Sequence, residues 1–228
     1  MLKVENTEVF GFEAAIRGAR NPMNSWEKSD SKRDGCGKAY GYYVGTNDLK
    51  LMKNLADAGS DHGKCLRFIT VVVDVTAPFY WWKEFKTYRV GRKFLDDGDE
   101  ILDPEEFEMF IETNSCSTMH KIHSKEFEWT DFSTEHLQIL ASEVLMDTIK
   151  YLNIYRKRYL ESKDKDDWWQ MIQLLPSSYN QKRTVQLNYH TLRRMYYARK
   201  HHKLDEWITF CDWIKTLPYA KELIIGEE

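Results

Sequence analysis

The sequence predicts an α+β fold, in which a small and mainly antiparallel sheet packs with several long helices. The clearest strand candidate is 66–76, LRFITVVVDVT, because this stretch is dense in β-branched residues. Other stretches repeat apolar side chains with the period of an amphipathic helix. No strand candidate leads into a Gly-x-Gly-x-x-Gly turn, so a Rossmann-type sheet is not expected.

The apolar periodicity also places the principal helices. In the first of them, Phe12 and Ile16 lie on the apolar face, and Arg20 leaves on the other side. In a later helix, Trp81 and Trp82 are expected to face inward. The expected helices cover 12–19, 47–58, 79–89, 133–162 and 204–217.

The longest expected helix, 133–162, carries an apolar stripe. Such a stripe is most often part of the core, and we expect it to be buried. Its members are Leu137, Leu140, Ala141, Val144, Tyr151, Leu152 and Tyr155.

Length and composition are those of a globular protein of 228 residues, with 42% hydrophobic and 30% charged residues. A single domain over 1–228 is expected. The net charge of −3 gives no general attraction to nucleic acid or to a membrane surface. The four cysteines form no Cys-x-x-Cys pair, and neither a signal peptide nor an apolar run of membrane-spanning length is present. These features predict a cytoplasmic protein.

An acidic stretch, 94–113, holds nine acidic residues and no basic one. A solvated insertion is the expected interpretation, and a divalent-cation site is the alternative because carboxylates supply oxygen ligands. Directly after it, Cys116, His120 and His123 are possible zinc ligands. No fourth ligand stands at the usual spacing, so no metal is expected.

The stretch 175–199, LPSSYNQKRTVQLNYHTLRRMYYAR, begins with a Leu-Pro break and continues as a long helical pattern. Asn188, Leu192, Met195 and Arg199 share one face, which is apolar in the middle and polar at both ends. Such a face can hold a flat polar ligand at two points. The alternative is a core helix in which the asparagine is a cap and the arginine lies at the rim.

Four blocks in this order resemble the flavin-dependent thymidylate synthases. AAIRGARNP is similar to the family's opening helix, and APFYWWKEFKTYR to its Ala-Pro helix leading into Arg-His-Arg. NSCSTMH stands where the family has Asn-x-x-Ser-x-Arg-Tyr. The block at 175–199 is similar to the family's Leu-Pro segment and its Asn-x-Arg-x-Leu and Leu-Arg helix.

The chain also departs from the family pattern. The Arg-His-Arg triplet reads Thr87-Tyr88-Arg89, and Glu84 replaces a glutamine. Three further family arginines are replaced by Met119, Ile172 and His190. Several of the missing arginines hold the nucleotide phosphate in the family. The retained family residues are Arg89, Asn114, Ser117, Asn188 and Arg199.

The resemblance implies reductive methylation of dUMP to dTMP. Methylenetetrahydrofolate would give the one-carbon unit, and NADPH would give the electrons through FAD. The candidate catalytic residues are Arg199, facing the uracil ring, and Ser117, beside the nucleotide. Lys83 and Glu84 join them as candidate substrate-binding residues. The candidate FAD-binding residues are Lys64, Arg67, Tyr88, Arg89, Asn114, Asn188, His190 and Arg194.

The resemblance further implies a homotetramer whose sites are shared between subunits. The charged or polar side chains of Lys83, Lys121 and His120 make them candidates for contacts to the nucleotide phosphate in place of the missing arginines.

Two other functions remain open from the sequence. One is a binding protein of the same fold that holds FAD or a nucleotide without methylating dUMP, which the replaced arginines favour. The other is a helical nucleic-acid-binding protein that uses 190–202. The negative net charge and the absence of a basic module with aromatic residues argue against nucleic acid.

Overall fold

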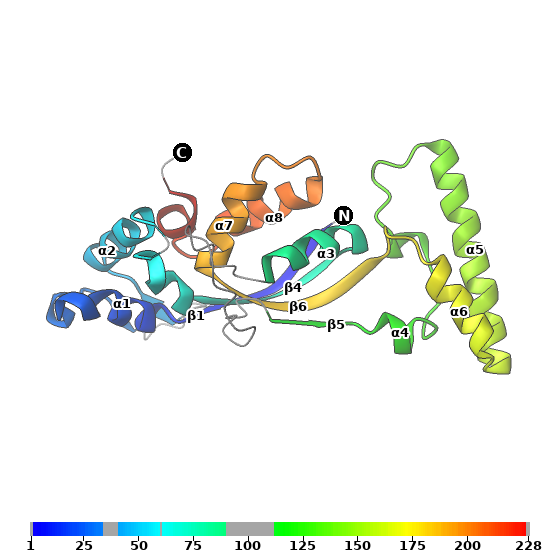
Figure 1. Ribbon diagram of the computed structural model, residues 1–228, viewed down its shortest axis with the longest axis horizontal. Coiled ribbons are helices and arrows are strands. Elements are labelled where there is room, and N and C mark those ends of the chain that lie inside the picture. The colour runs from blue at the N-terminus through cyan, green and yellow to red at the C-terminus, as the bar shows by residue number, and fades with distance from the viewer. Residues whose placement is uncertain (1, 34–40, 60, 90–111, 227–228) are drawn as a thin grey trace, which may run out of the picture. The chain divides into compact units, whose positions relative to one another are not determined.

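A computed structural model describes residues 2–33, 41–59, 61–89 and 112–226 (Figure 1). The chain divides into two compact units, each of which is described by itself. Unit 1 contains 1–3, 75–85 and 114–183, and unit 2 contains 4–74, 86–113 and 184–228. The single domain expected over 1–228 stays a prediction. The acidic stretch 94–113 lies outside the described residues except for its last two positions.

The main sheet of the described chain has four strands in the order β1-β4-β6-β5 (Figure 1). This small, mainly antiparallel sheet confirms the predicted α+β fold. Its central strand β4 alternates buried and half-buried residues along its length, which is the period of a sheet with one covered face. The strands are β1 (Lys3–Phe10), β4 (Thr70–Pro78), β5 (Glu112–Ser115) and β6 (Asn180–Asn188).

The strand predicted over 66–76 is displaced along the chain. Gly63–Phe68 forms a short 3-10 helix, η3, and β4 begins only at Thr70. The β-branched residues explain the boundary, because they start at Ile69 and η3 contains none.

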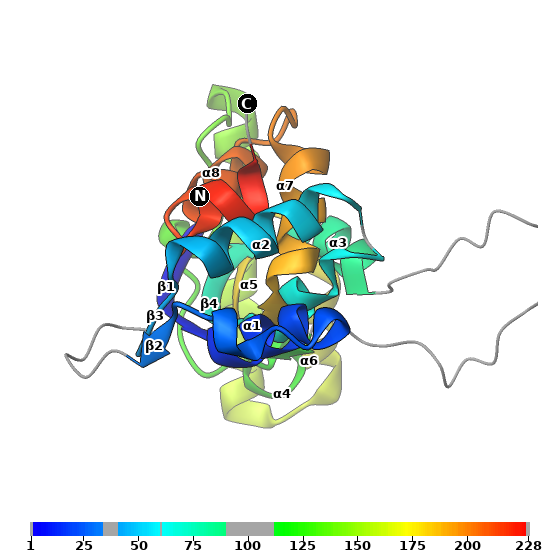
Figure 2. The ribbon, with the colours of Figure 1, turned by 90° about the vertical axis from the view of Figure 1, so that its left-hand side faces the viewer.

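Unit 2 contains a second, two-stranded antiparallel ribbon in addition to its helices, visible in Figure 2. The ribbon pairs β2 (Lys32–Arg33) with β3 (Tyr42–Tyr43). The longer helices of unit 2 are α1 (Phe12–Arg20), α2 (Thr46–Asp57), α7 (Tyr189–Arg199) and α8 (Asp205–Lys215). Its short helical segments are η1 (Asn21–Met23), η2 (Trp26–Lys28), η3, η4 (Lys86–Arg89) and η7 (Lys221–Ile225).

Gly11 joins β1 to α1 in a left-handed conformation, with φ 95°. A Cβ atom at this position would lie 2.0 Å from the main-chain oxygen of Phe68. Both the backbone angle and the close approach therefore require glycine. The turn directs Phe12 into the core, where its ring packs edge-on against Tyr189 and Tyr219.

Unit 1 contains the aromatic helix α3 (Phe79–Phe85), whose residues Trp81, Trp82 and Phe85 are buried as predicted. The indole nitrogen of Trp82 donates to the main-chain oxygen of Gln181 at 2.9 Å, which ties α3 to β6. The other helical segments of unit 1 are α4 (Thr118–Lys121), η6 (Trp129–Asp131), α5 (Ile139–Ser162) and α6 (Lys165–Leu174).

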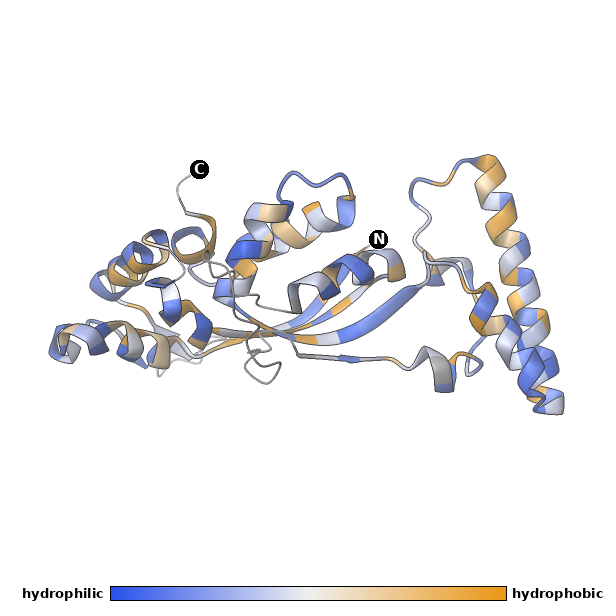
Figure 3. Cartoon of the chain, viewed as in Figure 1, coloured by the Kyte–Doolittle hydropathy of each residue, from blue (hydrophilic) through white to orange (hydrophobic). Residues whose placement is uncertain are grey.

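The prediction that the apolar stripe of α5 is buried is largely wrong. The helix begins at Ile139 rather than at 133, and Leu140 and Val144 are 77% and 67% exposed. Of the stripe, Leu152 is buried as predicted and joins a cluster with Leu145 and Met171, against which Tyr155 packs. Figure 3 shows apolar residues along much of α5. Because apolar residues occur on more than one side of this helix, periodicity alone does not identify the side that packs.

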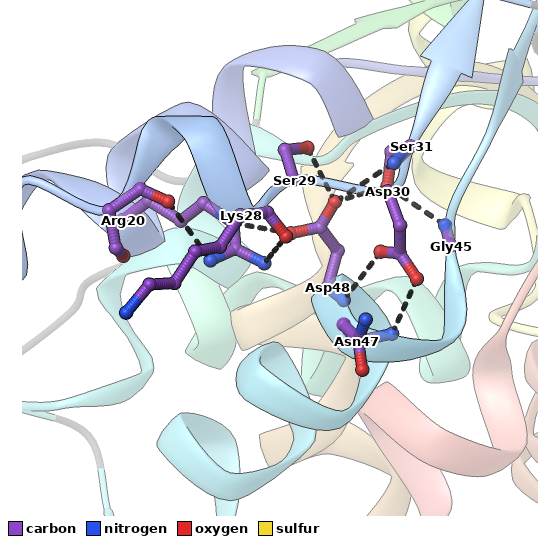
Figure 4. A network of polar contacts seen from close by, with 9 residues as sticks. Arg20, Lys28, Ser29, Asp30, Ser31, Gly45, Asn47 and Asp48 are labelled. Atoms are coloured by element: carbon purple, nitrogen blue, oxygen red, sulfur yellow. Dashed lines mark hydrogen bonds and ion pairs between the residues drawn. The ribbon is translucent and has the colours of Figure 1, made fainter.

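A buried ion pair links α1 to α2 in unit 2 (Figure 4). Arg20, which the sequence predicted to leave the helix on its polar side, is only 4% exposed. Its Nε atom donates to Asp48 Oδ1 at 2.6 Å. Its two Nη atoms donate to the main-chain oxygens of Ser25 and Lys28 at 3.1 and 3.0 Å. Helical periodicity missed this burial because the partner carboxylate lies on another helix.

The second oxygen of Asp48 organises the segment before α2. Its Oδ2 atom accepts from the hydroxyl groups of Ser29 and Ser31, at 2.6 and 2.5 Å (Figure 4). Burial raises the pKa of Asp48, but these hydroxyl bonds and Arg20 outweigh burial and hold the pKa below its usual value. The carboxylate is therefore stabilised in its charged form.

We expect Asp48→Asn to lower the free energy of unfolding by about 3 kcal/mol, because it leaves the Arg20 guanidinium buried without its counter-charge. Urea unfolding of the two proteins measures the difference. Asp212→Asn is the matched control, because Asp212 pairs with Lys215 at the surface and its loss is expected to cost less than about 1 kcal/mol. Equal effects of the two substitutions would contradict the assignment.

The same variant has an expected pH dependence. The folded pKa of Asp48 is lowered, so its contribution to stability is present above the unfolded pKa, about 3.9, and is lost as the pH falls through the folded value. The stability difference between wild type and Asp48→Asn should therefore shrink below about pH 4.

Candidate functional site

The site region of unit 2 begins where β6 passes into α7. Asn188 is the last residue of the strand and the N-cap of the helix, and its Oδ1 atom accepts from the main-chain N–H of Thr191 at 2.9 Å. The N–H of Tyr189 donates to the oxygen of Ile69 at 3.0 Å, which fixes this junction to the end of η3. Asn188 is thus a buried cap.

The long helical pattern predicted after the Leu-Pro break is correct only for its second half. Residues 180–188 form a strand, and only Tyr189–Arg199 is helical. Alternate residues of the strand are buried, namely Gln181, Arg183, Val185 and Leu187. Two of these are polar, so the strand period was not visible as an apolar pattern.

Three positively charged side chains act on His190, at the start of α7. Burial lowers the pKa of His190, and the positive charges of Arg67, Arg194 and Arg193 lower it further. We call these four residues the His190 cluster. Arg193 also has structural partners, because it donates to Asp57 Oδ1 at 2.9 Å and to the main-chain oxygen of Leu223 at 3.3 Å. A half-buried imidazole among guanidinium groups favours an anionic ligand.

The structure therefore brings together Arg67, His190 and Arg194, three of the candidate FAD-binding residues. Arg67 comes from η3, and the other two come from α7. Lys64 belongs to the same short helix as Arg67 and is exposed. Arg89 lies in η4, but its side chain is outside the described part of the chain.

At the other end of α7, Arg199 lies against two aromatic residues. Its Nε–H donates to the hydroxyl oxygen of Tyr88 at 2.7 Å. Its Cζ atom lies 4.8 Å from the ring centre of Trp207 and 5.4 Å from that of Tyr88. Trp207 is fully buried in α8, and Tyr88 comes from η4. Half-buried Arg199 is therefore held by two segments other than its own helix.

The remaining candidate residues belong to unit 1. Ser117 is exposed and caps α4, where its hydroxyl oxygen accepts from the main-chain N–H of His120 at 3.0 Å. Asn114 is exposed on β5. Lys83 is exposed and Glu84 half-buried on α3.

Sequence reasoning missed a polar group that holds the backbone beside Ser117. The Nε2 atom of Gln181 donates to the main-chain oxygen of Cys116 at 2.7 Å, and its Oε1 atom accepts from Arg183 Nε at 3.0 Å. The guanidinium of Arg183 lies 4.3 Å from the ring centre of Trp82. The only available signal was the alternation of 181, 183, 185 and 187, which indicates that Gln181 and Arg183 share the covered face of β6.

Within the described ranges, no group of three or more His, Cys, Asp or Glu side chains is arranged to hold a metal ion. In the same part of the chain, no helix combines the length and apolar character that crossing a bilayer requires.

Comparison with known proteins was informative only at the level of structure. No family model and no curated protein matches the sequence. Thymidylate synthase X (ThyX) of Helicobacter pylori, in a crystal structure with FAD and dUMP, matches with a TM-score of 0.64 at 16% identity. That match covers 98% of this chain and 97% of that chain.

A UMP/dUMP methylase of Streptomyces cacaoi, PolB, bound with 5-Br dUMP, matches with a TM-score of 0.58 at 13% identity. It covers 96% of this chain and 92% of that chain. Similarity at this identity concerns the path of the chain and not its chemistry. Because both alignments cover nearly the whole of each protein, we conclude that the chain has the fold of the flavin-dependent thymidylate synthases.

Proposed function

We propose that this protein is an FAD-dependent enzyme of the thymidylate synthase type, which methylates dUMP to dTMP with methylenetetrahydrofolate and NADPH. The observation that carries the proposal is the His190 cluster, in which the positive charges of Arg67 and Arg194 act on a half-buried histidine. The fold and the FAD and dUMP of the ThyX structure support the same assignment.

The residues of the cluster fit the anionic part of FAD. Guanidinium groups bind diphosphate oxygens bidentately. An anion beside His190 would also raise the pKa of this histidine, which its positive neighbours lower. Bound FAD would supply the redox chemistry, and the protein would supply binding, orientation and polarisation. The proposed FAD-binding residues are Lys64, Arg67, Arg89, Asn114, Asn188, His190 and Arg194.

In the same proposal, Arg199 donates to a carbonyl of the pyrimidine ring and stabilises negative charge that develops there. The donor is already held by Tyr88 and Trp207, so little reorganisation is needed when the substrate binds. Ser117, Lys83 and Glu84 are proposed to complete the contacts to dUMP.

A second candidate is a protein that binds FAD or a nucleotide without methylating dUMP. Met119, Ile172 and His190 stand where the family has arginines, and this observation favours it. The two candidates differ in one measurable property, because only the enzyme oxidises reduced flavin in a dUMP-dependent manner and releases dTMP.

We also propose that the protein is a homotetramer with shared sites. The exposed apolar residues of α5, among them Leu140, Val144 and Tyr151, support this assembly, because contiguous exposed apolar surface often marks an interface. A cytoplasmic location is part of the proposal and rests on the cysteine pattern, with Cys65 and Cys211 buried as free thiols.

Arg194→Ala should weaken FAD binding by about 10-fold to 100-fold, because it removes a charge-assisted contact worth roughly 1.5–3 kcal/mol. Quenching of flavin fluorescence by the apoprotein measures the dissociation constant. Arg194 is exposed, so the melting temperature should stay the same. Lys32→Ala removes another exposed positive charge and serves as the control. An unchanged affinity in Arg194→Ala would remove this residue from the FAD site.

Arg199→Lys should retain FAD binding but lose turnover by about 10²-fold to 10³-fold, as expected when one preorganised donor is removed. Lysine keeps the positive charge but not the planar fork that fixes a carbonyl. Single-turnover oxidation of the reduced flavin in the presence of dUMP measures the rate. If the rate is unchanged and only the melting temperature falls, Arg199 has a structural role alone.

Val144→Glu on the exposed side of α5 should break the assembly into smaller species, since a carboxylate would be buried at the interface. Sedimentation velocity measures the change, and circular dichroism checks that the fold is retained. Lys50→Glu, which alters charge at an exposed position of α2, is the control. A tetramer that survives Val144→Glu would show that α5 does not form the interface.

A further inference from the structure

We propose that Tyr88 and Trp207 are positioning residues that fix the guanidinium of Arg199 for its contact with the pyrimidine. This inference rests on the proposed function. It gives Tyr88 a different role from that of an FAD ligand, which is the role the resemblance implies for it. We call the pair Tyr88 and Trp207 the aromatic clamp.

The clamp contacts the guanidinium through one hydrogen bond and two aromatic rings. The Tyr88 hydroxyl accepts from Nε at 2.7 Å, so it engages one of the five N–H donors of the group. The ring centres of Trp207 and Tyr88 lie 4.8 and 5.4 Å from Cζ, within the range of cation–π attraction. The two rings are 5.9 Å apart and inclined by 64°, so they meet the group from different directions.

Trp207 is a rigid support for this arrangement. Its side chain is 0% exposed and packs edge-on against Phe210 and His202, with ring centres 5.9 and 6.2 Å away. The Nδ1 atom of His202 accepts from the N–H of Leu204, which fixes the turn between α7 and α8. The position of the indole ring is therefore set by the core of unit 2.

Arg199 needs such support because of its position. It is the last residue of α7, and a long side chain at a helix end samples many rotamers when nothing restrains it. A carbonyl donor has to be placed within about 0.5 Å to be effective, and a displacement of about 1 Å can lower a rate 10²-fold. The clamp supplies this restraint before the substrate binds.

One residue of the clamp departs from the family pattern. Tyr88 occupies the middle of the Thr87-Tyr88-Arg89 triplet, where the family pattern has a histidine. The phenol of Tyr88 offers Arg199 a hydroxyl acceptor and an aromatic ring, and both suit a guanidinium.

Tyr88→Phe is the test, because it removes the hydroxyl acceptor and keeps the ring. We expect kcat with dUMP to fall about 10-fold, as for partial loss of a preorganised donor. We expect the dissociation constant of FAD to stay unchanged. Calorimetric binding of dUMP to the apoprotein gives a readout that does not need turnover, and its affinity should fall less than kcat.

Tyr219→Phe is the matched control. It also deletes one tyrosine hydroxyl bond in unit 2, the one accepted from the N–H of Val44, and should leave kcat and KM unchanged.

A double-mutant cycle identifies the route of the effect. If Tyr88 acts through Arg199, adding Tyr88→Phe to Arg199→Lys should lower kcat by less than about twofold more, because coupled residues are non-additive. A full additional 10-fold loss would overturn the clamp. Weakened FAD binding with unchanged dUMP kinetics would overturn it too, and would assign Tyr88 to the flavin. If the wild-type protein neither binds nor converts dUMP, both the proposed function and this inference are wrong.

Discussion

The N-cap of α7 is the contact on which the candidate site of unit 2 depends. Asn188 ends β6 and accepts from Thr191, while Tyr189 donates to Ile69. Together these bonds fix where the helix starts and in which direction it runs. Arg199, eleven residues later, is then placed about 16 Å along the axis. The anion-favouring region at the start of α7 and the clamped arginine at its end are thus two ends of one rigid element.

Two charged regions of unit 2, around Asp48 and around His190, differ in their electrostatics. Between α1 and α2, Asp48 is saturated by Arg20 and two hydroxyl groups, and the pKa of its carboxyl is lowered. At the start of α7, His190 has its pKa lowered by burial and by positive neighbours, which act against its charged form. The first arrangement is complete within the chain and stabilises it. We propose that an anion binds beside the second, because negative charge there would favour the charged form of His190.

Most of the fold followed from local patterns. The β-branched run located β4 to within a few residues, and the aromatic run after Ala77-Pro78 correctly gave a buried helix. The strand Asn180–Asn188 was missed because its covered face includes Gln181 and Arg183, which do not count as apolar. For α5, the pattern indicated a helix correctly, but it could not tell which of several apolar sides packs against α6.

The site was predictable only in part, for a related reason. The resemblance selected His190, Arg67 and Arg194, which the structure brings together; their roles stay predictions. It could not provide the partners of Arg199, because Tyr88 is 111 positions away in the chain and is joined to it only by the fold. The same holds for Arg20, whose burial depends on a carboxylate in another helix.

The turn at Gly11 accepts no other residue type. A side chain there would meet the main-chain oxygen of Phe68, and no change of rotamer can move a main-chain atom away. A side chain that contacts a ligand can be replaced when the ligand changes. A turn that only glycine can make has no such freedom. At this turn the path of the backbone therefore dictates the residue type, and no substitution elsewhere on a side chain can compensate for the loss of glycine.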